Sequence, residues 1–493
     1  MRHYENFING VWCASNSGKE IESIDPATGD VWAYFSRGDD VDVAKAVAAA
    51  HLAFTQGEWG RFSAQQRADC ILSLADVLEH RWSTLVEAEV RDNGKRVSEV
   101  NAQFAGLHTW FRYFAQQLLD IEPEQLKNQI LGVSSTTHYL PFGVIGVITP
   151  WNSPLMILAW KIAPALAAGN TVVIKPSEHA SASTLEFAKL CAESSIPAGV
   201  INVITGFGHE AGEPLVKHPL TRKVTFTGSD FGGRKVAAAA ASGIIPITLE
   251  LGGKSPQLLF DDADMDNAIN GIVSGIFLSN GQSCVAGSRL IVEDNIHDEV
   301  VSKIIQRVSQ LKAGDPFDVK TQIAPLANRI HLDKVLSMIA LAKKQGAICV
   351  SGGEQQYPQE RPNGFYVQPT IFTEVTPDMS LWREEVFGPV LAVMRFSDEA
   401  EAVRLANDTD YGLAAGIWTQ DETRAQRIVQ QIHAGTVYIN HYRSVDPGSP
   451  IGGFKFSGYG RELGPNAVKD FMQVKSVWLG TAPCPDPFPQ TEK

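Results

Sequence analysis

Apolar and polar positions alternate between two patterns along most of the chain. Short apolar runs, typical of strands buried on both faces, occur at 143–149, 171–175, 201–204, 223–227 and 246–250. Between them, apolar residues spaced three and four apart predict helices at 155–168, 181–194, 210–217 and 230–241. This alternation indicates βαβ units and a parallel sheet, which binds ligands at the carboxyl ends of its strands.

A second series follows residue 252 and predicts a second α/β domain. Strands are expected at 256–260 and 288–293, and helices at 264–279, 296–311 and 331–345. Alternating elements then continue to about residue 440.

The first 120 residues follow a different pattern. Short strands with turns are expected at 5–37, then a helix capped by Asp40 or Asp42, a helix from Ser63 to Leu85 and a helix over 97–119. We expect these helices to pack over the sheet formed later in the chain. The Pro-rich segment 482–490 is expected to be irregular.

Composition narrows the function classes. The chain has 493 residues, 44% of them hydrophobic, and a net charge of -13, which argues against nucleic acid or an anionic membrane as partner. No secretion signal or membrane span is predicted. Six scattered cysteines without a C-x-x-C pair indicate a reduced, cytoplasmic protein, and no metal site is expected.

The candidate chemistry centres on a carboxylate and a thiol. Glu250 ends a strand at a Gly-Gly turn, and Cys284 lies in a loop rich in Gly, Asn and Ser. A thiolate is a strong nucleophile, and a carboxylate can activate the water that clears a covalent intermediate. An isolated cysteine is more often a small buried hydrophobe, so other motifs must decide.

Two further strand ends carry groups suited to a nucleotide. Lys175 and Glu178 follow one strand and could hold a ribose, although on this motif alone a solvated loop with Ser177 as helix cap is the better explanation. Gly228, Ser229 and Gly233 follow another strand where a helix begins, which favours an anion site. The G-x-G-x-x-G fingerprint is absent.

Two more motifs supply polar and aromatic side chains. Asn152 follows the strand at 143–149, where its amide can donate to an oxyanion, although such an asparagine is more often a turn residue. Glu385 and Phe387 lie in E-E-V-F-G-P-V, where the phenylalanine alone would be read as core.

Taken together, the motifs resemble the aldehyde dehydrogenase superfamily over nearly the whole chain. In order, they are T-P-W-N, K-P-S-E, F-T-G-S, L-E-L-G-G-K, N-G-Q-S-C, E-E-V-F-G-P-V and G-G-F-K-F-S-G-Y-G-R-E-L-G. Members of this family also lack the usual glycine fingerprint.

The resemblance implies roles for five residues. Cys284 would attack the aldehyde carbon, and Asn152 with the Cys284 amide would hold the oxyanion. Glu250 would activate water to hydrolyse the thioester, with Lys161 and Glu462 at positions linked to proton relay. The presence of Glu250 implies hydrolysis rather than acyl transfer to coenzyme A.

The resemblance also implies NAD as cofactor. Glu178 would repel a 2′-phosphate, so NAD is expected over NADP, although some relatives with this glutamate accept both. The residues expected to contact the cofactor are Ile148, Trp151, Lys175, Glu178, Gly208, Phe226, Gly228, Ser229, Gly233, Leu251, Glu385 and Phe387.

The implied fold is α/β in three parts. A Rossmann-type nucleotide-binding domain would comprise 1–121 and 142–251, and a catalytic α/β domain 252–471. A small β oligomerisation flap would comprise 122–141 and 472–493. Because that flap extends a neighbouring subunit's sheet in relatives, a homodimer or homotetramer is expected.

The substrate is an aldehyde whose identity the motifs leave open. Ser153 and Ile451 replace aromatic residues of many relatives, and Arg443, with or without His441, is hypothesised to meet a polar or anionic group. A solvated loop charge or a pair with Asp446 explains Arg443 equally well. A polar or anionic semialdehyde and an aromatic aldehyde are both considered, and the residues expected near the substrate are Met156, Trp160, Ser283, Val285, Arg443 and Ile451.

Two other functions remain as alternatives. A cofactor-free thiol esterase or acyltransferase would use the cysteine, the glutamate and the asparagine but leave K-P-S-E and F-T-G-S without a purpose. A non-catalytic structural member of the fold would be expected to lack the nucleophile or the base, and both are present.

Overall fold

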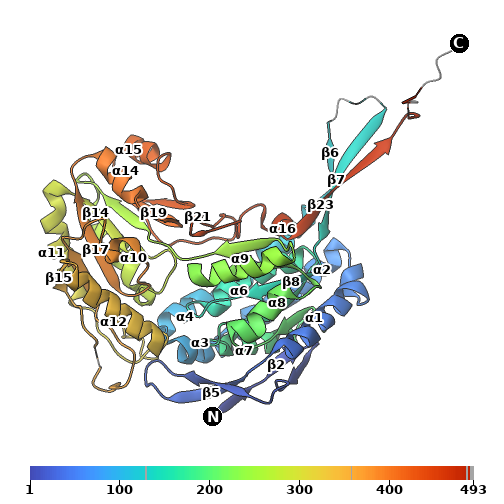
Figure 1. Cartoon of the computed structure of the whole chain (residues 1–493), viewed down its shortest axis with the longest axis horizontal. Coiled ribbons are helices and arrows are strands. Elements are labelled where there is room, and N and C mark those ends of the chain that lie inside the picture. The colour runs from blue at the N-terminus through green and yellow to red at the C-terminus, as the bar shows by residue number, and fades with distance from the viewer. Residues whose placement is uncertain (128–129, 131, 357, 485–486, 489–493) are drawn as a thin grey trace.

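The structure is a computed structural model that describes residues 1–127, 130, 132–356, 358–484 and 487–488. Two α/β bodies lie side by side, and a narrow β arm projects from one of them (Figure 1). Within the part of the chain just defined, no helix is both long and apolar enough to span a membrane. Of the Pro-rich segment 482–490, residues 485–486 and 489–490 lie outside the described residues.

The first body is built on an eight-stranded sheet in the order β22-β12-β11-β8-β9-β10-β2-β3. The five central strands are parallel and confirm the predicted runs: β8 (Val144–Ile148), β9 (Thr171–Lys175), β10 (Ile201–Val203), β11 (Thr221–Thr227) and β12 (Ile247–Glu250). Antiparallel edges are added by β2 (Asn6–Ile8), β3 (Val11–Cys13) and β22 (Gly458–Tyr459).

Alternate residues of each strand enter different cores, because strand side chains point to opposite faces. Ile145 and Val147 pack with α2 (Ala64–Arg81), α5 (Leu107–Leu119), α6 (Pro154–Ala167) and α7 (Ala182–Cys191). Val144 and Ile148 pack on the other face with α1 (Asp40–Thr55), α8 (Glu213–Lys217) and α9 (Asp230–Ser242). Both faces of the sheet are therefore covered by helices, as expected.

The second body contains a seven-stranded sheet in the order β15-β16-β17-β14-β13-β19-β20. Its strands are β13 (Pro256–Leu259), β14 (Arg289–Glu293), β15 (Ile348–Ser351), β16 (Thr370–Thr373), β17 (Val390–Phe396), β19 (Ala414–Trp418) and β20 (Thr436–Ile439). One face packs against α10 (Met265–Phe277) and α11 (His297–Val308). The other packs against α12 (Arg329–Lys344), α13 (Ser380–Arg383), α14 (Glu399–Asn407) and α15 (Glu422–Val429).

The arm is a three-stranded antiparallel sheet of β6 (Glu124–Leu126), β7 (Val133–Pro141) and β23 (Met472–Gly480). All nine residues of β23 pair with β7, and both strands extend away from the two bodies (Figure 1). A further three-stranded sheet contains β1 (Arg2–Tyr4), β4 (Glu20–Ile24) and β5 (Val31–Ser36). The domain boundaries proposed from the sequence stay predictions.

Three helix predictions in the first 120 residues were wrong in detail. The helix over 97–119 is two helices, α4 (Val97–Ala105) and α5, because Gly106 between them leaves helical geometry (φ -97°, ψ 4°). The helix from Ser63 ends at Arg81, a 3-10 turn continues to Leu85, and α3 (Val86–Asn93) was not predicted. The cap of α1 is Asp39, with Asp42 as its capping-box partner, not Asp40 or Asp42.

Candidate active site

Cys284 lies on a tightly turned loop that follows α10. Ser279, Asn280 and Gly281 all have positive φ (52°, 53° and 69°), so the chain reverses within three residues. A Cβ at position 281 would lie 2.1 Å from the Gly388 carbonyl oxygen. Only glycine fits there, because both the backbone conformation and the close approach exclude a side chain.

Hydrogen bonds from three directions fix this loop. The Glu99 carboxylate on α4 accepts from the Ser279 amide (2.9 Å), although α4 belongs to the other body. Asn280 Nδ2 donates to the Pro325 carbonyl (3.0 Å), and the Ala327 amide donates to Gln282 Oε1 (2.9 Å). The position of Cys284 is thus set by contacts to both bodies.

Cys284 opens into a cavity of about 350 Å³ that several other predicted site residues also line. Predicted residues in its lining are Trp151, Asn152, Gly228, Ser229, Leu251, Cys284, Glu385 and Phe387. Burial, with the neighbouring charges of Glu385 and Glu250, raises the pKa of the Cys284 thiol to about 12. The thiol is therefore neutral at physiological pH in this state of the site.

Asn152 lies just beyond the carboxyl end of β8, with its side chain toward the Cys284 loop. Its Nδ2 donates one hydrogen bond to the Gln282 carbonyl (2.9 Å), which orients the amide. A primary amide carries two N–H groups, so a second donor remains for a ligand atom.

Glu250 ends β12 between β11 and β22, where Gly458 is its partner residue across the sheet. The carboxyl group is buried, and no hydrogen-bond partner of its Oε1 is found among the described residues. Burial first, and the charge of Glu462 second, raise the pKa of Glu250 well above its usual range, while Lys161 opposes the shift. Glu250 does not line the Cys284 cavity itself.

Lys161 and Glu462 form a buried ion pair, and both charges influence the pKa of Glu250. Their side chains are 0% and 3% exposed, and Thr225 Oγ1 contacts both partners (3.0 and 3.1 Å). Backbone hydrogen bonds pair Glu462 with Ile451 in both directions (2.8 and 2.9 Å). The pair therefore joins α6, β11 and the C-terminal segment at one point.

A second cavity adjoins the carboxyl ends of β8 and β9. Predicted cofactor residues in its lining are Ile148, Lys175, Glu178, Gly208 and Phe226. Lys175 Nζ donates to the Gly206 carbonyl (2.9 Å) and reaches Glu178 at 3.5 Å. Burial is the largest single influence and raises the pKa of Glu178, but the charges of Lys175 and His179 and the hydrogen bonds to the carboxylate together outweigh it, so the pKa is lowered.

Ser229 and Gly233 both shape the start of α9. Ser229 is the N-cap, and its Oγ accepts from the Gly232 amide (3.1 Å). A Cβ at Gly233 would lie 2.6 Å from Leu251 Cδ2, so the glycine allows α9 to approach the strand end closely. Gly233 lines neither cavity.

Glu385 and Phe387 close one side of the Cys284 cavity. The Gly253 amide donates to Glu385 Oε1 (2.8 Å), and burial raises the pKa of Glu385 to about 7. Phe387 has a positive φ of 60°, and its ring meets Trp151 edge to face at 5.4 Å.

Sequence reasoning missed several residues of the cavity wall. Two of them, His331 and Lys334, lie on α12, which no motif marked as part of the site. Their presence depends on α12 packing against the segment 384–388, a tertiary contact without a local sequence signal. The missed lining residues are Pro150, Ile157, His179, Thr227, Gly252, Asn328, Ile330, His331 and Lys334.

None of the six residues predicted to contact substrate lies in either cavity wall; they are Met156, Trp160, Ser283, Val285, Arg443 and Ile451. Arg443 Nη1 donates to the carbonyls of Ser274 (3.3 Å) and Leu278 (3.0 Å), on the segment that leads to Cys284. Within the described residues it makes no ion pair with Asp446. His441 is exposed and contacts Ser444.

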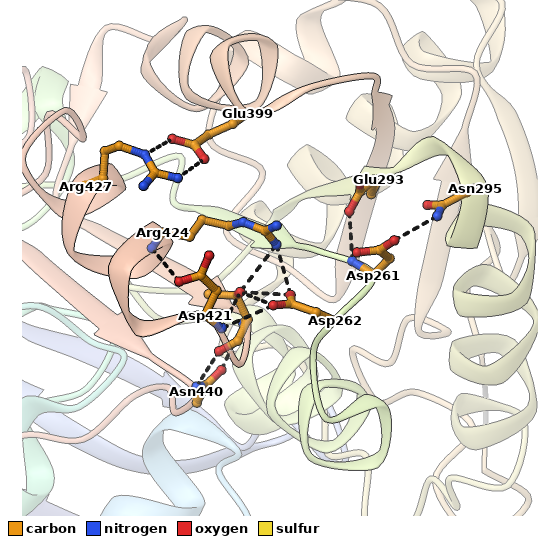
Figure 2. A network of polar contacts seen from close by, with 10 residues as sticks. Asp261, Asp262, Glu293, Asn295, Glu399, Asp421, Arg424, Arg427 and Asn440 are labelled. Carbon is orange, nitrogen blue, oxygen red and sulfur yellow. Dashed lines mark hydrogen bonds and ion pairs between the residues drawn. The ribbon is translucent and has the colours of Figure 1, made fainter.

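The loop that carries Arg443 is anchored by the polar network of Figure 2. At its centre, Asp262 accepts from Thr419 Oγ1 (2.8 Å) and Arg424 Nη1 (3.0 Å). Asn440, where the loop leaves β20, donates to the Thr419 carbonyl (2.8 Å) and accepts from its amide (3.1 Å). The start of the loop is thereby fixed to the ends of β13 and β19.

The sequence of this chain is similar to those of known proteins. Residues 12–477 match the Aldehyde dehydrogenase family. The chain is 42% identical over 479 residues to an aldehyde dehydrogenase of Emericella nidulans, covering 96% of this chain and 94% of the relative. It is 40% identical to (Z)-2-((N-methylformamido)methylene)-5-hydroxybutyrolactone dehydrogenase of Acinetobacter baylyi, covering 99% of both.

The chain is also similar to solved structures. A betaine aldehyde dehydrogenase from Staphylococcus aureus in complex with NAD+ superposes with a TM-score of 0.96 at 35% identity, covering 99% of this chain and 97% of that one.

Proposed function

Because the chain belongs to the aldehyde dehydrogenase family, we propose that it oxidises an aldehyde to the carboxylic acid with NAD as acceptor. The observation that carries this proposal is the convergence of Cys284, Asn152, Glu385 and Phe387 on one cavity, with Lys175 and Glu178 in the next.

Cys284 is proposed as the nucleophile toward the aldehyde carbon. Its half-buried thiol is neutral, with a pKa of about 12, so attack requires loss of the thiol proton. The second N–H of Asn152 and the Cys284 amide would then stabilise the oxyanion of the thiohemiacetal. One such donor typically contributes about 3–4 kcal/mol at the transition state.

The residues present fit NAD. Lys175 and Glu178 offer a cation and a carboxylate for the adenosine ribose, and Glu385 offers a carboxylate for the nicotinamide ribose. NAD, when bound, supplies the acceptor for the hydride that leaves the Cys284 adduct, which becomes a thioester. Glu178 would repel a 2′-phosphate, which favours NAD over NADP.

Glu250 is proposed as the base that activates water against the thioester. Its raised pKa supports this role, because a carboxylate of raised pKa accepts a proton more readily. Lys161 and Glu462 would carry the proton away, since Glu462 lies close enough to raise the pKa of Glu250.

The proposed substrate is a polar or anionic semialdehyde, with an aromatic aldehyde as the second candidate. The Arg443 guanidinium supports the first, because only its Nη1 is bonded to protein among the described residues. Arg443→Ala should lower kcat/KM for a carboxylate-bearing aldehyde about tenfold, and for a neutral alkanal less than about twofold. An equal loss for both aldehydes would remove Arg443 from substrate recognition.

The arm is proposed to join subunits into a homodimer or homotetramer. Val474, Trp478 and Leu479 on β23 are 68%, 55% and 64% exposed, which supports burial against a second copy. We also propose that the protein works in the cytoplasm, because its six cysteines are all free.

The test is NADH formation from NAD across a panel of aldehydes, with Cys284→Ala alongside. The panel includes short alkanals, benzaldehydes, amino aldehydes and carboxylate semialdehydes. Turnover by the wild type that disappears in the variant supports the proposal. Failure to bind NAD would overturn it, and Cys284-dependent ester hydrolysis without NAD would favour the esterase alternative.

A further inference from the structure

The segment 384–388, which carries Glu385 and Phe387, is held from behind by one face of α12. His331 Nε2 lies 2.7 Å from the Phe387 carbonyl oxygen, and Lys334 Nζ donates to the Glu385 carbonyl (3.0 Å). The two side chains are three positions apart, so they project from the same side of the helix. Asn328 caps α12 and accepts from the His331 amide (2.9 Å), which fixes the first turn.

The backbone held in this way is strained. Phe387 has a φ of 60°, in the left-handed region that bulky side chains disfavour. Such a conformation persists only where surrounding contacts enforce it. Two contacts do so here, namely the hydrogen bond to its carbonyl and the packing of its ring.

The ring of Phe387 belongs to an aromatic triangle. Its centroid lies 5.4 Å from Trp151 and 5.8 Å from His331, and Trp151 and His331 are 5.0 Å apart. All three residues line the cavity that contains Cys284. A change in the Phe387 backbone would therefore move part of the wall of the cavity that contains Cys284.

The His331 ring is neutral. Burial lowers the pKa of His331 to about 4, the charges of Lys334 and His179 add to this shift, and the Phe387 carbonyl opposes it. Because a carbonyl only accepts hydrogen bonds, the proton of the neutral ring must be on Nε2. The contact is thus a donated hydrogen bond over the physiological pH range.

We propose that His331 is a positioning residue for the cofactor. It holds Phe387 in its strained conformation, so that the ring closes the nicotinamide end of the cavity beside Cys284. This inference rests on the proposed function, because it assigns that end of the cavity to the nicotinamide.

The test compares His331→Leu, which removes the donor, with His331→Gln, which keeps an N–H at similar reach. Leu should raise the KM for NAD and its dissociation constant about tenfold, and Gln less than about threefold. The dissociation constant is measured by quenching of tryptophan fluorescence. Equal losses in both variants, or no loss in either, would overturn the proposal, whereas a wild type inactive with NAD would overturn the proposed function instead.

A double-mutant cycle shows whether His331 acts through Phe387. Glycine tolerates positive φ, so in a Phe387→Gly background the His331→Leu change should add less than about twofold to the KM for NAD. Additive effects would overturn the proposal. If His331→Leu does not fold, ¹⁵N NMR of the wild type at pH 6 decides: a ring protonated on Nε2 supports the proposal, and a neutral ring protonated on Nδ1, whose Nε2 cannot donate to the Phe387 carbonyl, contradicts it.

Discussion

The two cavities shift the pKa of their carboxyl groups in opposite directions. Around Cys284, burial raises the pKa of the thiol to about 12 and of Glu385 to about 7, and lowers that of His331 to about 4. All three shifts favour the neutral form. In the second cavity, Lys175 instead lowers the pKa of Glu178 and keeps it ionised.

We therefore expect the cavity with Cys284 to serve the chemical step and the cavity with Glu178 to serve cofactor binding. A neutral thiol becomes a strong nucleophile only after a base removes its proton. An ionised carboxylate accepts hydrogen bonds from hydroxyl groups without a prior change of charge. Substitutions of Cys284 and of Glu178 should therefore change different quantities: turnover in the first case and the KM for NAD in the second.

The largest effect is expected at the thiol. Cys284→Ala should reduce NAD-dependent turnover at least about 10⁴-fold, because Cys284 is the only cysteine among the described residues that line the cavity. NAD binding, measured by fluorescence, should persist, since the second cavity is untouched. Residual turnover within tenfold of the wild type would mean that another group attacks the aldehyde.

The next largest effect is expected at the base. Glu250→Gln should lower the steady-state rate about 10²–10³-fold while a rapid burst of NADH remains, because acylation precedes the step that needs the base. Stopped-flow absorbance measures the burst. Loss of the burst together with the steady rate would place Glu250 in acylation instead.

The pH dependence should follow from the raised pKa of Glu250. A carboxyl group is inactive as a base when protonated, so turnover should fall as pH falls through this raised pKa. Lys161→Met removes the cation that opposes the shift, and should move the acidic limb of the kcat profile to higher pH. A limb that stays in place would exclude coupling between Lys161 and the base.

The smallest effect is expected in the second cavity. Glu178→Gln should raise the KM for NAD about tenfold, leave kcat within about twofold, and reduce the preference for NAD over NADP. Glu193→Gln, at an exposed ion pair with Arg81, is the matched control. A fall in kcat without a change in KM would contradict the separation of binding from chemistry.

The sequence predicted the central strands well because each is a continuous apolar run buried on both faces. The sequence did not predict the helix break at Gly106, because good helix formers lie close to it. It also did not predict α3, because the eight residues of this helix carry only a weak apolar pattern. The proposed catalytic residues were named from motifs, and their roles stay predictions. His331 was not named, because its role arises only when α12 packs against the segment 384–388.

The pairing of β22 with β12 has a consequence for synthesis on the ribosome. Glu250 has its edge neighbour Gly458 and its buried neighbour Glu462 only after almost the whole chain has emerged. At about 5–20 residues per second, the intervening roughly 210 residues take about 10–40 s to translate. During that interval the first sheet has an open edge, and a truncated product would keep Cys284 but lack the surroundings of its base.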